Sequence, residues 1–132
     1  MTLQQVPQEQ AIRLTMPARV ELLRLARMTA ATVCAELGFS LQDIEDVRVA
    51  VDELAALLIE DVIDGASLDL RFDPDPDTLT VVGEVADGTG PLPEIHAVAA
   101  ELLSLVVDSY ELSLEDGVRR FRLVKHRGRI PA

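Results

Sequence analysis

Three carboxylate side chains, those of Asp46, Glu53 and Glu60, are spaced seven residues apart. In an α-helix this spacing places them along one side, because each residue turns the helix by about 100°. Stacked carboxylates can hold a metal ion or serve as a general base, and they are also typical of a solvated acidic face. Glu53 stands out because Val49 and Leu57 flank it on the same side. Apolar surroundings favour the neutral form of a carboxyl group, which suits a base.

The segment DGTG, residues 87–90, is a second candidate for chemistry. Backbone N–H groups in a glycine-rich turn can approach a phosphate group closely. A tight loop between a strand and a helix also needs glycine, so the segment on its own has two interpretations.

The histidines and the cysteine give no support to a metal site. His96, His126 and Cys34 are far apart in the sequence, and no pair has the spacing of zinc ligands. His96 is typical of an ordinary helix residue and Cys34 of a small packing residue. We therefore predict no metal.

Hydrophobic periodicity predicts the elements that position these residues. Residues 11–15 alternate between apolar and polar types, as in a strand. Pro17 suits the first turn of a helix that Gly38 ends. Ser40 is the expected N-cap of a second helix that runs to near Gly65.

The second half of the chain predicts two hairpins and a helix. Strands are expected over residues 67–72 and 78–86, a helix over 94–108, and a second strand pair over 110–113 and 118–125. The order β-α-α-β-β-α-β-β favours an α/β two-layer sandwich, in which three helices cover one face of a mostly antiparallel mixed sheet.

Length and composition indicate one domain over residues 1–132, with loose termini over 1–10 and 127–132. Hydrophobic residues make up 48% of the chain, enough for a core. No apolar run is long enough to cross a membrane, and the first residues lack the pattern of a secretion signal. A single cysteine fits a reducing cytoplasm, so we expect a cytoplasmic protein without a membrane partner.

The formal net charge of −11 argues against direct nucleic-acid binding, because a phosphate backbone repels such a surface. A basic protein partner would complement the charge and speed encounter. Acidic surfaces also serve solubility alone, so the charge does not choose between these two interpretations.

The segment LLRLARMTAATVCAELGFSLQDIEDVRVAVDEL, residues 22–54, resembles the bacterial anti-sigma factors with serine-protein-kinase activity. These proteins antagonise sporulation and general-stress sigma factors and belong to an ATPase superfamily that includes the histidine kinases. The resemblance extends from about Ile12 to Lys125 and implies the histidine-kinase-like ATPase fold.

The first ATP motif of that family, E-x-x-x-N, is only half present. Glu53 matches the glutamate, which in the family activates the target serine as a base. Leu57 stands where the family has the asparagine that holds Mg²⁺, and leucine has no oxygen to offer that ion. Asp61 replaces a histidine that usually follows.

The second motif, D-x-G-x-G, is also incomplete. Gly88 and Gly90 match its glycines, but Ala86 replaces the aspartate that reads adenine, and Asp87 is one residue out of register. Only PLPEIHAV, residues 91–98, follows where the family has a long lid, so the lid is shortened. The resemblance thus implies a degenerate member in which Glu53, Gly88 and Gly90 are vestigial and neither ATP nor Mg²⁺ is bound. We lean against an enzyme.

The partner-binding surface of the family, in contrast, has a match in this sequence. Family members contact the sigma factor and the anti-anti-sigma factor through an arginine on the first helix, and Arg27 has the matching distance from Glu53, with Arg24 beside it. A solvated surface arginine would look the same in the sequence.

The prediction is a homodimeric anti-sigma factor that sequesters a sigma factor and is antagonised by an anti-anti-sigma factor of the STAS type. Two alternatives stay open. One is an active serine-protein kinase that uses Mg-ATP, and the other is a regulatory interaction module that binds no sigma factor.

Overall fold

The structure is a computed structural model that describes residues 10–86 and 90–128. Along the chain its elements are β1 (Ile12–Pro17), a 3₁₀ turn (Val20–Leu22), α1 (Leu23–Glu36), α2 (Leu41–Ile59), β2 (Ser67–Pro74), β3 (Thr78–Val85), α3 (Ala97–Val106), β4 (Ser109–Glu115) and β5 (Val118–His126). Within these described ranges, no helix combines the length and the apolar composition that crossing a bilayer requires.

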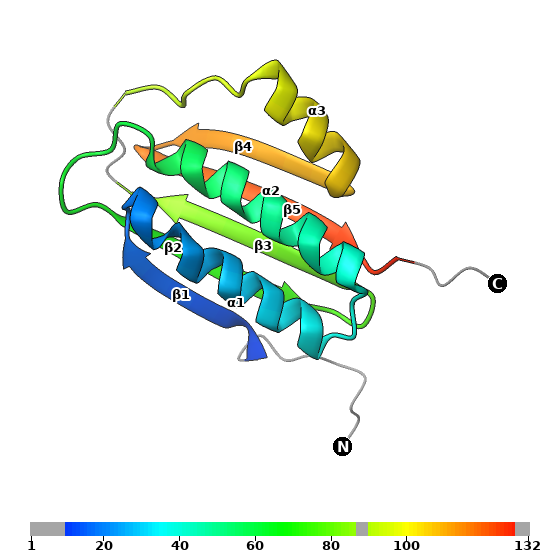
Figure 1. Ribbon diagram of the computed structural model, residues 1–132. Coiled ribbons are helices and arrows are strands. Elements are labelled where there is room, and N and C mark those ends of the chain that lie inside the picture. Colours follow the sequence, from blue (N-terminus) through cyan, green and yellow to red (C-terminus); the bar gives the residue numbers. More distant parts are fainter. Residues whose placement is uncertain (1–9, 87–89, 129–132) are drawn as a thin grey trace.

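The five strands form one sheet in the order β1-β2-β3-β5-β4. All four pairings are antiparallel, where the sequence predicted a mixed sheet that is only mostly antiparallel. Figure 1 shows α1 and α2 lying across one face of the sheet, with α3 beside α2 and near β4. The predicted two-layer α/β sandwich is therefore confirmed.

The core lies between the sheet and the helices. Alternate side chains of each strand point to it, because successive residues of a strand face opposite sides. Small residues on α1 and α2 allow these two helices to lie close together and over the sheet. The buried residues of the two helices and of the strands include Ala26, Ala30, Ala50, Val51, Leu54, Leu58, Leu68, Leu70, Phe72, Leu79, Val81, Phe121 and Leu123.

The other face of the sheet is polar. Thr15 on β1 donates a hydrogen bond to Asp69 on β2 over 2.6 Å, and Arg120 on β5 lies 3.7 Å from a carboxylate oxygen of Glu84 on β3. The strands thus show the alternation of apolar and polar residues that their sequences predicted.

Three helix boundaries differ from the prediction. Pro17 is the last residue of β1, where it pairs with Ser67, and a 3₁₀ turn separates it from α1. Helix α2 ends at Ile59, well before Gly65, because Glu60 is extended and Asp61 has a left-handed backbone with φ of 57°. Helix α3 begins at Ala97 instead of residue 94, since the preceding residue is extended.

The first two residues of the tail that we expect to be loose, Arg127 and Gly128, make contacts with the folded chain. The guanidinium of Arg127 lies 2.8 Å from the carboxylate of Asp77, and its backbone N–H donates to the carbonyl oxygen of the same residue. The N–H of Gly128 donates to Asp43 over 2.8 Å. Residues 129–132 and 1–9 lie outside the described part of the chain.

Candidate functional site

Helix α2 positions the half-buried Glu53. Ser40 caps the helix by accepting a hydrogen bond from the backbone N–H of Asp43, as predicted. One turn after Glu53, the side chain of Leu57 is buried, with 8% of its surface exposed. An apolar side chain therefore occupies the position at which the family motif would supply a metal ligand.

The carboxylates of Asp46, Glu53 and Glu60, which are seven residues apart in the sequence, do not form one site. Asp46 accepts a hydrogen bond of 3.1 Å from Lys125, and Glu60 lies beyond the end of α2, where the backbone is extended. Among the residues that the structure describes, no three histidine, cysteine or acidic side chains form a group that could hold a metal ion.

The glycine segment is only partly described. Gly88 and Asp87 fall outside the described residues. Gly90 is exposed and has φ of 77°, a left-handed conformation that favours glycine. Ala86, at the position of the family's adenine-reading aspartate, directly follows β3 and is also exposed.

A buried arginine that the sequence prediction missed lies between these two segments. Arg119 on β5 is 1% exposed. Its Nη1 atom donates to the carbonyl oxygens of Leu58 at 3.0 Å and Glu60 at 2.6 Å, and its Nη2 atom donates to that of Pro91 at 3.4 Å. The guanidinium thus bridges the end of α2 to the segment that follows Gly90.

This position suits a cation. The last carbonyl groups of a helix lack partners within the helix and carry partial negative charge, which a guanidinium can neutralise with several N–H groups. Arg119 therefore lies between the end of α2, at Leu58 and Glu60, and Pro91, which follows Gly90 in the sequence.

A second buried cation holds the opposite end of α2. Lys125, also on β5, donates to Asp46 and, over 2.8 Å, to the carbonyl oxygen of Val106 at the end of α3. The carboxylate of Asp43 lies 3.7 Å from the same amino group. Lys125 thereby joins α2, α3 and β5.

Close to this cluster, Cys34 on α1 is fully buried. Burial, assisted by the negative charge of Asp43, raises the pKa of the Cys34 thiol to about 12. A thiol with so high a pKa is protonated at neutral pH and is a poor nucleophile, which agrees with a packing role.

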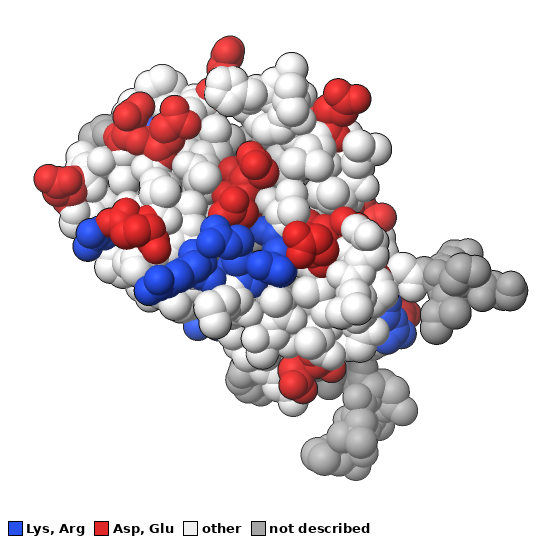
Figure 2. Space-filling view, in the orientation of Figure 1, with Lys and Arg blue, Asp and Glu red and all other residues white. Residues whose placement is uncertain are grey.

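The predicted partner residues lie on the outer side of α1. Arg24 is exposed, whereas Arg27 is half-buried and forms an ion pair of 2.7 Å with Asp52 on α2. Arg48 on α2, which the prediction did not include, lies one turn before Asp52 and pairs with Glu45 at 3.0 Å. Figure 2 shows that basic side chains gather in a stripe over α1 and α2, with acidic groups along its sides.

Comparisons with known proteins agree with this structure. No protein-family model matches the chain. The serine-protein kinase RsbW of Halalkalibacterium halodurans is 24% identical over an alignment of 133 residues, which covers 86% of this chain and 82% of the relative. The chain is therefore similar in sequence to an RsbW anti-sigma kinase over most of its length. The resemblance stated from the sequence is therefore confirmed.

A solved structure shows the same fold as the RsbW-like chain. It is the crystal structure of the RsbU and RsbW domains of Rv1364c from Mycobacterium tuberculosis, with a TM-score of 0.68 and 16% sequence identity. The match covers 89% of this chain and 32% of the other, so the RsbW-like chain spans about a third of that longer protein.

The sequence prediction for this RsbW-like chain did not include Arg119 and Lys125 as buried cations. Their positions in the sequence could have indicated this role. Arg119, Phe121, Leu123 and Lys125 occupy every second position of β5, so all four belong to the face that points to the core. A charged residue in phase with core residues indicates a buried cation with specific partners, since an unpaired one would be costly.

Proposed function

We propose that this RsbW-like chain is an anti-sigma factor that sequesters a sigma factor of the stress or sporulation type by direct binding and without ATP. In this proposal an anti-anti-sigma protein of the STAS type competes for an overlapping surface on α1 and thereby releases the sigma factor. The relationship to RsbW supports the regulatory role. The position of Arg119 is the observation that supports a mechanism without ATP.

Two features support a mechanism without nucleotide. Mg²⁺ requires oxygen ligands in near-octahedral geometry, and the buried Leu57 offers none. The guanidinium of Arg119 lies between the end of α2 and Pro91, where a nucleotide would need to contact both motifs. Phosphoryl transfer depends mainly on positioning and charge stabilisation, so the loss of the metal ligand removes most of its basis.

The outer side of α1 supports partner binding. Arg24 is exposed, and the side chain of Arg27 stays 37% exposed beside its contact with Asp52. An arginine has five N–H donors, so one carboxylate does not exhaust its capacity. Both arginines therefore keep donors that a partner could use.

An active kinase is the second candidate. The name of the relative, a serine-protein kinase, and the presence of Glu53 on α2 favour it. In that case Glu53 would activate a serine hydroxyl of the anti-anti-sigma partner, and ATP and Mg²⁺ would be the cofactors.

The deciding experiment has two steps. The full chain is first used to purify its partners from the native host, and mass spectrometry identifies them. The partners are then incubated with the chain and Mg-ATP, and their intact masses are measured. We expect a sigma factor and a STAS-type protein, with no added phosphate.

Each other result has a definite meaning. A phosphate that is added by the parent chain and lost in Glu53→Ala would establish the kinase. A STAS-type protein without any sigma factor would favour an interaction module instead. The homodimer implied by the resemblance stays a prediction, which light scattering of the purified chain tests.

A further inference from the structure

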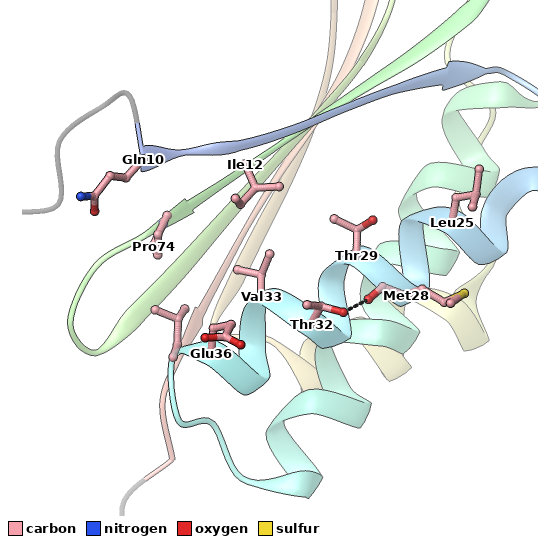
Figure 3. Close-up of a pocket in the computed structure, with 10 residues that line it drawn as sticks. Gln10, Ile12, Leu25, Met28, Thr29, Thr32, Val33, Glu36 and Pro74 are labelled. Carbon is pink, nitrogen blue, oxygen red and sulfur yellow. Dashed lines mark hydrogen bonds between the residues drawn. The ribbon is translucent and has the colours of Figure 1, made fainter.

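Strand β1 separates an apolar groove from a charged hollow. On the side of the helices, Figure 3 shows Ile12 of β1 with Leu25 and Met28 of α1 along the groove. On the outer side of the sheet, Arg13 and Thr15 border the charged hollow, which has a volume of about 340 Å³. This volume lies within the range of small-molecule sites in proteins, about 300–1,000 Å³.

Two pairs of like charges lie side by side in the charged hollow, and all four side chains line it. The antiparallel register places Arg13 on β1 directly opposite Arg71 on β2. Two positions away along β2, Asp69 lies directly opposite Glu84 on β3. Two positions along a strand correspond to about 6–7 Å. A cationic pair and an anionic pair therefore face outward at this separation.

The remaining charges on this face of the sheet are paired differently. Like charges directly opposite each other on neighbouring strands destabilise a sheet. Towards β5 and β4 the register instead pairs opposite charges, since Arg120 lies opposite Glu84 at 3.7 Å and Arg122 lies opposite Glu111. Local arrangements that oppose stability are expected at functional sites, so the like-charge pairs around β2 indicate a role in binding.

Contacts within the charged hollow neutralise its charges only in part. Arg71 forms an ion pair of 2.8 Å with Asp73. The exposed Arg13, in contrast, makes no ion pair or side-chain hydrogen bond with the residues that the structure describes. Asp69 accepts a hydrogen bond of 2.6 Å from the hydroxyl group of Thr15, which carries no charge to offset that of the carboxylate. The hollow therefore offers N–H donors to an anion and carboxylate oxygens to a cation.

We propose that the charged hollow binds a small zwitterion. The carboxylate of this ligand contacts Arg13 and Arg71, and its ammonium group contacts Asp69 and Glu84. Because the two pairs are about 6–7 Å apart, the ligand carries its two charges on an extended carbon chain, as an ω-amino acid does. The half-buried Val82, which lies opposite Arg71 and lines the hollow, offers an apolar contact to that chain.

This site goes beyond the proposed function. It lies on the outer face of the sheet, whereas the residues proposed for partner binding and the remnants of the ATP motifs lie on or beside the helices. Its ligand can therefore be sought with the purified chain alone.

Binding of 5-aminopentanoate to the full chain tests the proposal. Pentanoate and pentylamine are the matched controls, because each has the same carbon skeleton and only one of the two charges. Changes in the amide chemical shifts of the isotopically labelled chain report binding and its location. We expect shifts on β1, β2 and β3, and an affinity at least about tenfold higher than that of either control, since one charge contact corresponds to about a factor of ten.

Two variants locate the site. Arg13→Gln removes a contact to the carboxylate of the probe and Glu84→Gln removes one to its ammonium group, so each should weaken binding about tenfold. The control, Arg24→Gln, removes the same charge as Arg13→Gln from an exposed position on α1 and should leave binding unchanged. In the absence of ligand, Arg13→Gln should not lower the melting temperature, because it relieves a like-charge pair. A purely structural role of Arg13 would produce a loss of stability instead.

The proposal is overturned if 5-aminopentanoate causes no shifts at millimolar concentration, or if Arg13→Gln and Glu84→Gln bind it as the parent does. Equal affinity for pentanoate would reduce the hollow to an anion site, and equal affinity for pentylamine would reduce it to a cation site. Either result would also reject the proposal. None of these outcomes depends on whether a sigma factor is recovered in the partner purification.

Discussion

The guanidinium of Arg119 donates a hydrogen bond of 2.6 Å to the carbonyl oxygen of Glu60. Strand β5 thereby caps the C-terminal end of α2 from within the core. Lys125, six residues along the same strand, contacts Asp46 near the beginning of α2. One strand therefore holds both ends of the helix that carries Glu53.

Replacing Arg119 by alanine should destabilise the fold. The change leaves helix carbonyl groups without their charged donor, and such hydrogen bonds contribute about 1.5–3 kcal/mol each, not additively. We expect the free energy of unfolding to fall by about 3 kcal/mol in urea denaturation. The control is Arg122→Ala, an exposed position on the same strand, where the change should stay below about 0.5 kcal/mol. Equal losses in the two variants would contradict the capping role.

Restoring the family's metal ligand should damage the protein. Leu57→Asn replaces a buried leucine by an amide that needs hydrogen-bond partners, and we expect a loss of about 2–3 kcal/mol in the free energy of unfolding. Leu41→Asn is the matched control, because Leu41 is 87% exposed. If Leu57→Asn were as stable as the parent and Mg-ATP raised its melting temperature, the site would be less degenerate than we propose.

Gly83 on β3 lies under the ring of Phe121 on β5. A Cβ atom added at Gly83 would lie 2.2 Å from Cε2 of that ring, far inside van der Waals contact. Gly83→Ala should therefore reduce the free energy of unfolding by about 2 kcal/mol, as in other overpacked cores. Phe121→Leu in the same chain should recover part of this loss, and strictly additive effects would show that the two residues do not interact.

The thiol of Cys34 should make stability fall in strongly alkaline solution. Its pKa is raised from 9.0 to about 12 in the folded chain, chiefly by burial and then by Asp43. The folded state thus retains a proton that the unfolded state loses above pH 9.0. The contribution of this thiol to the free energy of unfolding is therefore complete below pH 9.0 and declines as the pH rises towards 12. Unfolding measured between these limits should show a smaller decline in Cys34→Ala.

The same residue offers a direct chemical check. A thiol reagent at pH 8 should not modify folded Cys34 and should modify it readily in urea. Rapid labelling of the folded chain would show that Cys34 is accessible.

The alternation of β2 and β3 and the spacing of apolar residues on α1 and α2 were enough to predict the fold class, because these periodicities report which side chains are buried. Local chemistry also located Ser40 as an N-cap. Helix ends were predicted less well, since the end of α2 depends on the left-handed Asp61 and no glycine or proline marks it.

The candidate site was only partly predictable. Glu53, Leu57 and Arg27 followed from motif spacing, which fixes their positions on two helices. The role of Arg119 depends on a contact between segments far apart in sequence, since 61 residues separate Arg119 from Leu58. No local pattern predicts that a core position of β5 faces the last carbonyl groups of α2.

Lys125 is the one lysine of the chain, and it is buried. Acylating reagents that target side-chain amines therefore find no lysine on the surface. They can react with Lys125 only when α2 and α3 separate from β5. The rate of acylation therefore measures how often this junction opens. A partner that stabilises the packing of the helices on the sheet would lower the rate of acylation, even when it binds far from the amine.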